Sequence, residues 1–455
     1  MGQEAAGGEY AAGGGIGGIG GISAVGILIR SKHMQDNKSF TNIRSLLGAL
    51  AKSMNLINPD MEHHHEQTAY LAYLIGTERS MDTEDLHLMI YAALLHDVGA
   101  VVWEKQQSVL EIEKKAKYVS AIGARMLRDL NRFGEIADVI EICQNSYLEN
   151  RKIAEERGGR YPLYIEIADA IHLADTVSII LKEDVPVLNQ VKQICAVVEG
   201  CRDKEYASET VDAFLQVSRR EFVWLDIMLN PSFLMIFTGD IHPVSLEEAV
   251  QITGFMSRII DFRSPFTAMH SAGVAASAKK LAELAGMSEE ECLMMEIAGN
   301  LHDVGKLRVP RAILEKPGKL DEEEFNVIKE HTYYTRLILM GVDGFEKIAD
   351  WAGFHHEKLN GKGYPFHFDA PMLDMGSRIM AVADIFSAIT EERPYRKGMD
   401  KAAALKVLHE NVESGGISGE IVELLEAHYE EVDVARDARS REAGKRYFAS
   451  LEQDA

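Results

Sequence analysis

Residues 298–306 read AGNLHDVGK and residues 92–100 read AALLHDVGA, so a His-Asp pair recurs in similar surroundings in the two halves of the chain. A second match lies upstream, where the segment that begins at His64 resembles the segment that begins at His270. In both halves, 32 residues separate this upstream histidine from the histidine of the His-Asp pair. Self-similarity at a fixed spacing indicates two copies of one structural unit.

A third match lies downstream, where residues 171–175 (IHLAD) resemble residues 380–384 (MAVAD). Elsewhere apolar residues recur at three-, four- and seven-residue spacing, and only 11 prolines interrupt 455 residues. This periodicity is typical of amphipathic helices, and alternating strand patterns are scarce. The sequence therefore predicts an all-α fold, with two related helical domains in tandem joined by linker helices.

Composition shifts and turn signals suggest where these domains begin and end. The segment GGGIGGIGG at residues 13–21 marks a Gly-rich leader, which we expect to be disordered or left over from cloning. Asn-Pro at 230–231 and Gly-Asp at 239–240 are likewise expected breaks. The predicted divisions are a leader (1–37), a first helical domain (38–200), a helical linker (201–260), a second helical domain (261–411) and a helical C-terminal tail (412–455).

Charge and cysteine usage restrict the classes of partner. The formal net charge of -23 argues against polymeric nucleic acid and anionic membrane surfaces, because both are polyanions. No apolar run is long enough to cross a bilayer, and no signal peptide is expected. The four cysteines form no CxxC pair, which is typical of reduced thiols in a cytoplasmic protein.

The second half carries a dispersed set of histidines and carboxylates that suits divalent iron, manganese or zinc. Each residue alone is more often a core or surface residue than a ligand; Asp384, for example, could pair with Arg378 or Arg393, and His331 could be exposed. The ordered set is a stronger signal, because an adjacent His-Asp pair allows the carboxylate to bridge two ions. The candidate metal ligands are His270, His302, Asp303, His331, His355, His356 and Asp384.

The ordered motifs of the second half resemble one known family. The segments HDVGK at 302–306 and HHEKLNGKGYP at 355–365 are similar to those of HD-GYP phosphodiesterases, and the resemblance extends over about residues 261–399. It implies a helical HD-superfamily domain that hydrolyses cyclic di-GMP or a related cyclic dinucleotide to the linear dinucleotide. The first half would then be a degenerate HD domain with a regulatory or dimerising role.

The resemblance also implies a role for each matching residue. One metal ion would be held by His270, His302, Asp303 and Asp384, and a second by His331, His355 and His356 with Asp303 as the bridge. Two divalent ions, iron or manganese, would supply a metal-bound hydroxide as nucleophile. Lys306 would stabilise charge on the scissile phosphate beside Asp303. The expected substrate contacts are Gly363, Tyr364, Pro365, Arg393 and Arg396.

One position departs from the family pattern. Members with three metal ions have a glutamate four residues before the first histidine, where this chain has Phe266. Phenylalanine cannot bind a metal ion, so we expect two ions and a reaction that stops at the linear dinucleotide. Asp261 or a water molecule is an alternative source of the missing oxygen.

The first half keeps counterparts of one ion's ligands, namely His64, His96, Asp97 and Asp175. It has Ala100 in place of the lysine and Gln144-Asn145 where the adjacent histidines would fall, so a two-metal centre cannot form. Three interpretations stay open for this half: a vestigial scaffold, a module that senses a metal ion or ligand, and a dimerisation domain that would make the protein a homodimer.

Two classes of function compete for the second half. The first is an enzyme that hydrolyses a cyclic dinucleotide, and the second is a signalling module that binds a cyclic dinucleotide or a partner protein without turnover. A complete ligand set together with Lys306 favours the enzyme, because a pure binding module has no need of all these groups.

Overall fold

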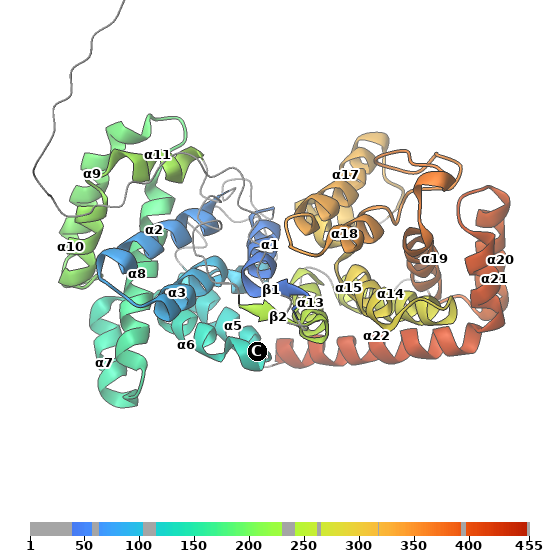
Figure 1. Cartoon of the computed structure of the whole chain (residues 1–455), viewed down its shortest axis with the longest axis horizontal. Helices are drawn as coiled ribbons and strands as arrows, with labels where there is room; N and C mark the ends of the chain where they lie inside the picture. The colour runs from blue at the N-terminus through green and yellow to red at the C-terminus, as the bar shows by residue number, and fades with distance from the viewer. Residues whose placement is uncertain are drawn as a thin grey trace, which may run out of the picture. The chain divides into compact units, whose positions relative to one another are not determined.

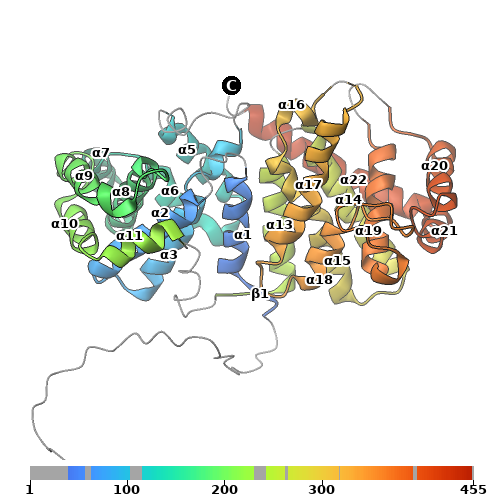
Figure 2. The same ribbon diagram turned by 90° about the horizontal axis from the view of Figure 1, so that it is seen from above.

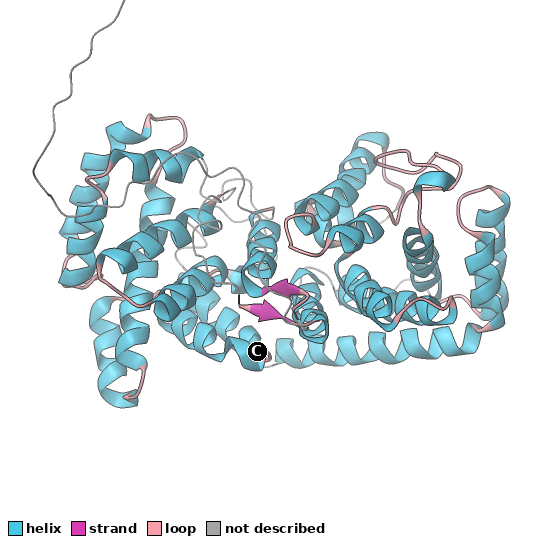
Figure 3. Cartoon of the chain, in the orientation of Figure 1, coloured by secondary structure: helices cyan, strands magenta, loops and turns pink. Residues whose placement is uncertain are grey.

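The computed structural model describes residues 39–56, 63–102, 115–229, 242–261, 265–316, 318–392 and 397–452. Nearly all the regular structure in these residues is helical (Figure 3). The strands among them are β1 (Thr41–Asn42) and β2 (Pro243–Val244), which pair antiparallel with Thr41 opposite Val244. The all-α prediction is therefore confirmed, whereas the predicted leader lies outside the described residues.

Helices of the first half form one bundle (Figure 1). The central helix α2 packs against α3, α8 and α10, and α5 packs against α6. Leu71, Ile75 and Ile171 are fully buried between these helices. The elements are α1 (Ile43–Asn55), α2 (His64–Glu78), α3 (Thr83–Leu95), η2 (Val98–Val102), α5 (Ala116–Leu127), η3 (Asn131–Phe133), α6 (Gly134–Ile142), α7 (Tyr147–Arg157), α8 (Tyr161–Ile180), α9 (Val187–Gly200), α10 (Ser208–Val217) and α11 (Glu221–Leu229).

Helices of the second half form a second bundle around α14, which packs against α15, α19 and α22 (Figure 2). Leu281, Met295 and Val382 are fully buried in its core. The elements are α13 (Leu246–Asp261), α14 (Pro265–Leu284), α15 (Glu289–Leu301), η5 (Val304–Arg308), α16 (Arg311–Leu314), α17 (Glu322–Leu339), α18 (Glu346–Gly353), η6 (Ala370–Met372), α19 (Met375–Thr390), α20 (Lys401–Glu413), α21 (Gly419–Ala427) and α22 (Tyr429–Glu452).

The predicted linker and tail pack onto these bundles. Helices α10 and α11 contact α2 in the first half, and α13 contacts α14 and α15 in the second. The last helix, α22, runs alongside α14 (Figure 1). Within the described residues, no helix combines the length and the apolar character that crossing a membrane requires.

The His-Asp pair lies where α15 ends and the chain turns into η5. Helix α15 begins at a capping box in which Ser288 and Glu291 satisfy each other's backbone amides. After the turn, Gly305 lies so close to α17 that a Cβ atom there would stand 2.0 Å from the carbonyl oxygen of His331. The Thr335 hydroxyl donates to the carbonyl of His302 at 3.0 Å and accepts from the Gly305 amide at 3.0 Å.

The first half repeats this close approach. A Cβ atom at Gly99 would stand 2.1 Å from the carbonyl oxygen of Val119 and 2.8 Å from the amide nitrogen of Gly123. A Cβ atom at Gly305 would likewise stand 2.8 Å from the amide nitrogen of Thr335. Val119 is therefore the structural counterpart of His331.

Candidate functional site

Five helices of the second bundle bring the predicted metal ligands together. His270 lies on α14, His302 and Asp303 follow α15, and His331 lies on α17. His355 and His356 follow α18, and Asp384 lies on α19. Three overlapping groups of these side chains have ligand atoms close enough to hold a metal ion: His270–His302–Asp384, His302–Asp303–His355 and His331–His355–His356.

The first group surrounds Asp384. His270 Nε2 lies 3.1 Å from Asp384 Oδ1, and His302 Nε2 lies 4.0 Å from the same oxygen. The Nδ1 atom of His302 donates to the carbonyl of Gly299 at 2.8 Å, which directs Nε2 into the site. Backbone fixation of one ring nitrogen is the usual way in which a protein orients a histidine ligand.

The second group is oriented in the same way. His331 donates from Nδ1 to the carbonyl of Ile328 at 2.5 Å, and His355 donates to the carbonyl of Ala352 at 2.6 Å. Their Nε2 atoms therefore face each other across 3.5 Å. The alternative interpretation of His331 as an exposed residue is wrong, because this side chain is fully buried.

Asp303 lies between the two groups. Its Oδ2 atom is 3.2 Å from His302 Nε2, whereas its Oδ1 atom is 3.5 Å from His331 Nε2 and 3.9 Å from His355 Nε2. One carboxylate oxygen thus faces each group, which is the geometry that a bridging carboxylate requires.

Burial of these polar side chains costs free energy unless a cation is bound. His302 Nε2 and Asp303 Oδ1 are buried atoms that have no hydrogen-bond partner among the described residues. Buried polar groups are normally satisfied, and an orphaned pair of this kind is expected where an ion binds. The nitrogen and oxygen donors present therefore fit divalent transition-metal ions.

The pKa values divide the histidines into two classes. Burial lowers the pKa of His331 to about 3 and of His355 to about 4, so both imidazoles are neutral and able to bind a metal ion. Burial also opposes protonation of His270, but hydrogen bonds to Asp384 and Glu391 outweigh it and raise the pKa to about 9. Burial works against the charged form of Asp384 too, yet the nearby histidines hold the pKa of this carboxyl far below its usual range.

Lys306 lies at the edge of this cluster. Its ammonium group donates to Asp303 Oδ2 at 2.5 Å, and its side chain is 24 % exposed, so it reaches both the buried carboxylate and the surface. Burial disfavours the charged form of Asp303, but His302 and Lys306 keep the pKa of this carboxyl well below its usual range.

The loop that carries Gly363, Tyr364 and Pro365 covers the cluster at His356. The ring of Tyr364 lies 4.9 Å from the ring of His356, measured between centroids. Gly363 approaches the backbone of Glu357 so closely that a Cβ atom would stand 2.4 Å from its Cα atom. Only glycine fits at this position, which explains why glycine precedes Tyr364 in the motif.

Two buried glutamates near the site were not predicted. Glu357 accepts from the amides of Phe366 at 2.7 Å and Phe368 at 3.0 Å, and so holds the Tyr364 loop. Glu391 Oε2 lies 3.6 Å from His270 Nδ1, on the side of the ring that faces away from Asp384. The sequence could have indicated Glu357, because this residue directly follows the predicted ligand His356. No feature of the sequence indicated Glu391.

The structure decides one of the alternative roles considered for Asp384. Asp384 bonds to His270, and Arg378 instead donates to the carbonyls of Leu373 and Ala370, so the proposed ion pair between Asp384 and Arg378 is wrong. Arg393 and Arg396 lie outside the described residues, as do the side chains of Asp261 and Phe266.

The first half assembles a smaller cluster. His64 Nε2 lies 3.1 Å from Asp175 Oδ1 and 3.6 Å from Asp97 Oδ2. His96 Nε2 lies 3.4 Å from each of the same two oxygens. The Nδ1 atom of His64 forms a hydrogen bond with Ser178 Oγ at 2.8 Å, and the Nδ1 atom of His96 forms one with the carbonyl of Ala93 at 2.7 Å. His64, His96 and Asp175 form one buried set of donors that could hold a single ion, and Asp97 lies beside them.

Comparison with known proteins agrees with the two-fold repeat. Residues 61–177 and residues 254–420 each match a family described as HD domain. A crystal structure described as a cyclic GMP-AMP specific phosphodiesterase of V. cholerae is similar with a TM-score of 0.60 and 23% sequence identity, over 86% of this chain and 98% of that chain. This likeness concerns the fold.

The names of the similar proteins share one type of activity. The 3'3'-cGAMP-specific phosphodiesterase 1 of Vibrio cholerae is 27% identical over 88% of this chain and 94% of its own length. The 3'3'-cGAMP-specific phosphodiesterase 3 of the same organism is 42% identical over 35% of each chain. The cyclic di-GMP phosphodiesterase response regulator RpfG of Xanthomonas campestris is 36% identical over 34% of this chain and 41% of that protein. This chain thus spans nearly all of the first relative but well under half of the other two.

Proposed function

This chain belongs to the HD superfamily, and we propose that its second half is a metal-dependent phosphodiesterase that opens a cyclic dinucleotide to the linear dinucleotide. The observation that carries the proposal is the position of Asp303, whose two oxygens face two groups of buried histidines. The catalytic domain would span residues 261–411, after a regulatory or dimerising domain at 38–200 and linker helices at 201–260.

The proposed cofactors are two divalent ions, iron or manganese. One would be held by His270, His302, Asp303 and Asp384, and the other by Asp303, His331, His355 and His356. When bound, the ions supply an activated water and neutralise the charge of the phosphodiester. The neutral state of His331 and His355 supports loading of the second ion, because only unprotonated imidazole binds a metal ion. Binding of the first ion would displace a proton from His270, whose pKa is about 9.

The chain's own residues would orient the substrate and stabilise its charge. Lys306 is the cation beside Asp303, and its partly exposed ammonium can donate to a phosphate oxygen as negative charge develops there. Water adds to phosphorus while the bond from phosphorus to the departing 3′ oxygen breaks, and that oxygen takes up a proton. The ring of Tyr364, between Gly363 and Pro365, would contact the substrate next to His356.

Substrate recognition is expected to favour cyclic di-GMP, with the mixed guanine–adenine dinucleotide as the competing substrate. Both names occur among the relatives: the relative matched over 94% of its length is named for 3'3'-cGAMP, whereas the cyclic di-GMP phosphodiesterase RpfG is matched over 41% of its length, so the turnover assay must compare the two substrates directly. Arg393 and Arg396 remain the proposed contacts for phosphate or guanine, since a guanidinium group donates two parallel hydrogen bonds.

The test is a turnover assay on protein purified without oxygen and analysed for bound metals. Each cyclic dinucleotide is incubated with the full chain, and the products are separated by chromatography. We expect linear dinucleotide from the wild type and none from His302→Ala or Asp303→Ala. His409→Ala serves as the matched control, because His409 lies exposed on α20 and pairs with Glu426.

Two outcomes would contradict the proposal. Undiminished turnover in Asp303→Ala would show that the buried cluster is not the reacting centre. Tight binding of a cyclic dinucleotide by metal-loaded wild-type protein, without any product, would support the alternative of a non-hydrolytic signalling module.

A further inference from the structure

Another group of possible metal ligands lies where the linker begins, away from both His-Asp clusters. Glu84 and His87 are three residues apart on α3 and therefore lie on one face of that helix. His242 directly precedes β2, and 155 residues of chain separate it from His87. Each of the three side chains offers one ligand atom, and these atoms lie within 4.8 Å of one another.

The two histidines present ring nitrogens to each other. His87 Nδ1 lies 3.2 Å from His242 Nε2, and the two ring planes are inclined by 86°. Two nitrogens that are each about 2.0–2.1 Å from a tetrahedral zinc ion lie about 3.3–3.4 Å apart, so the observed spacing fits zinc. Glu84 Oε2 is 4.0 Å from His242 Nε2, and its side chain is 74% exposed, so it can rotate closer. A hydrogen bond between the rings has a similar length, so ion binding has to be measured directly.

Packing and backbone pairing hold the two rings in place. His87 is 4% exposed, and its ring stacks on the ring of Tyr91 at 6.1 Å between centroids. The ring of His242 packs edge-on against the same tyrosine at 5.9 Å, and the His242 carbonyl accepts from the Ile43 amide at 3.1 Å. Because both imidazoles are already restrained, little conformational entropy is lost when an ion binds.

The surroundings of the group can accept a cation. A cavity of about 300 Å³ borders the three side chains and has room for a water molecule at a fourth coordination position. Two arginines line this cavity, but both are neutralised by carboxylates. Arg160 donates to Glu135 at 2.8 Å, and Arg132 donates to Glu248 at 2.5 Å.

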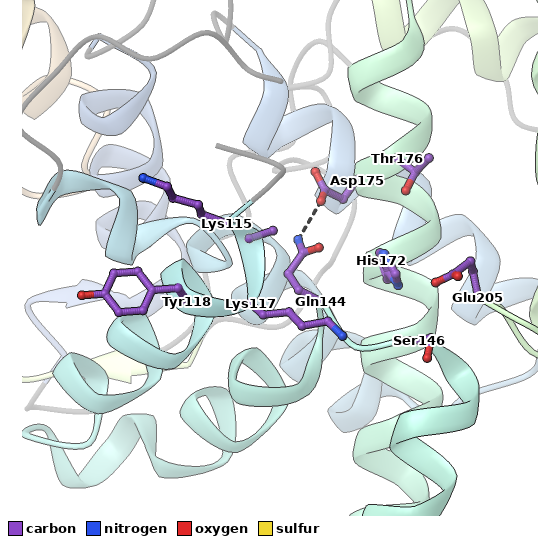
Figure 4. Close-up of a pocket in the computed structure, with 10 residues that line it drawn as sticks. Lys115, Lys117, Tyr118, Gln144, Ser146, His172, Asp175, Thr176 and Glu205 are labelled. Atoms are coloured by element: carbon purple, nitrogen blue, oxygen red, sulfur yellow. Dashed lines mark hydrogen bonds between the residues drawn. The ribbon is translucent and has the colours of Figure 1, made fainter. Parts of the chain in front are cut away.

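This group is separate from the buried cluster of the first half. In that cluster, Gln144 donates to Asp175 at 2.7 Å beside a different cavity (Figure 4). Among the described residues, none lines both cavities. A change in metal content caused by a substitution at one group can therefore be assigned to that group.

We propose that Glu84, His87 and His242 bind one zinc ion, with water as the fourth ligand, and that this ion fastens the start of the linker to the first bundle. Two imidazoles and one carboxylate are a donor set that zinc binds in tetrahedral geometry. Helix α3 belongs to the first bundle, whereas β2 leads into α13, which packs on α14 and α15. The ion takes no part in the hydrolysis proposed for the second half.

Zinc binding is measured on the full chain, equilibrated with a chelator buffer at fixed concentrations of free zinc. We expect His242→Ala to bind one zinc ion fewer per chain than the wild type, because two remaining donors hold the ion weakly. His409→Ala is the matched control, because His409 is an exposed histidine that pairs with Glu426, and it should keep the zinc content of the wild type. Ions at the two His-Asp clusters are common to all these proteins and cancel in the difference.

A surface substitution keeps the test decisive if His242→Ala disturbs the fold at β2. Glu84→Ala, which removes an exposed carboxylate, is expected to weaken zinc binding at this group at least about tenfold. Glu156→Ala is its matched control, because Glu156 is exposed on α7 and lies outside the lining of the cavity.

Amide hydrogen exchange tests whether the ion fastens the linker. The Ile43 amide donates to the carbonyl of His242, so its exchange should slow about tenfold when zinc is added at ten times its dissociation constant. The same addition should have no effect on this amide in Glu84→Ala. Unchanged exchange in the zinc-loaded wild type would overturn the fastening. Equal zinc binding in the wild type, His242→Ala and Glu84→Ala, or an equal loss in the two control proteins, would overturn the site itself.

Discussion

Replacing Gly305 by alanine tests whether the contact between η5 and α17 holds the catalytic cluster together. The added Cβ atom would stand 2.0 Å from the carbonyl oxygen of His331 and 2.8 Å from the amide nitrogen of Thr335. Both obstacles are backbone atoms, so a side-chain rotation cannot relieve the clash. The two segments must separate, and the segments carry Asp303 and His331 on opposite sides of the proposed second ion.

The size of this displacement follows from the contact itself. An ordinary Cβ contact begins at 3.4 Å, so the carbonyl of His331 must move by about 1.4 Å. Metal sites tolerate deviations of about 0.2 Å in their ligand distances, and a misplacement of about 1 Å in an active site lowers the rate about 100-fold. We therefore expect loss of one metal ion per chain, a turnover number at least about 100-fold lower, and destabilisation of about 1–3 kcal/mol from overpacking.

Metal analysis, cyclic-dinucleotide turnover and thermal unfolding measure these effects. Gly254→Ala is the matched control, because the nearest atom to a Cβ there is 3.8 Å away and α13 favours alanine over glycine. Gly99→Ala creates the same backbone clash in the first half, at 2.1 Å from the carbonyl of Val119. It should destabilise the protein while leaving the ions of the second half bound.

Full metal content in Gly305→Ala, together with turnover within about twofold of the wild type, would show that this contact does not position the metal ligands. Equal effects of Gly305→Ala and Gly99→Ala on metal content in the second half would also refute this positioning role, because global destabilisation would then explain both.

Three further predictions follow from the cluster. Lys306→Met should lower the turnover number about 100- to 1,000-fold with unchanged metal content, and an unchanged turnover number would exclude the proposed role at the phosphate. Glu391→Gln should weaken metal binding about 10- to 100-fold in a chelator competition, whereas the exposed neighbour Glu392→Gln should not; equal effects would contradict the contact with the histidine ring. In metal-free folded protein, His331 and His355 have pKa values of about 3 and about 4, below the value of 6.5 in the unfolded chain. As the pH falls, the unfolded chain therefore takes up protons on these histidines before the folded protein does. The free energy of unfolding in urea should therefore fall as the pH drops below 6.5, and a constant value down to pH 4 would contradict this.

Much of the molecule could be predicted from local patterns in the sequence. Helical periodicity predicted an all-α fold, because the spacing of apolar residues reports directly which face of a helix is buried. The recurrence of the His-Asp pair at an equal distance from His64 and from His270 predicted the two-fold repeat. The ligand candidates were found because histidines and aspartates in apolar surroundings need a partner that the neighbouring sequence does not supply.

Tertiary structure alone decided how these residues face one another. No local pattern indicates that Glu391 lies behind His270, since 121 residues of folded chain separate them. The correspondence of Val119 with His331 became apparent only from the contact between Gly99 and Val119, because loop lengths hide the register of one repeat on the other. Sequence spacing records which side chains lie on one helix face, whereas the distance between faces of different helices depends on how the whole bundle packs.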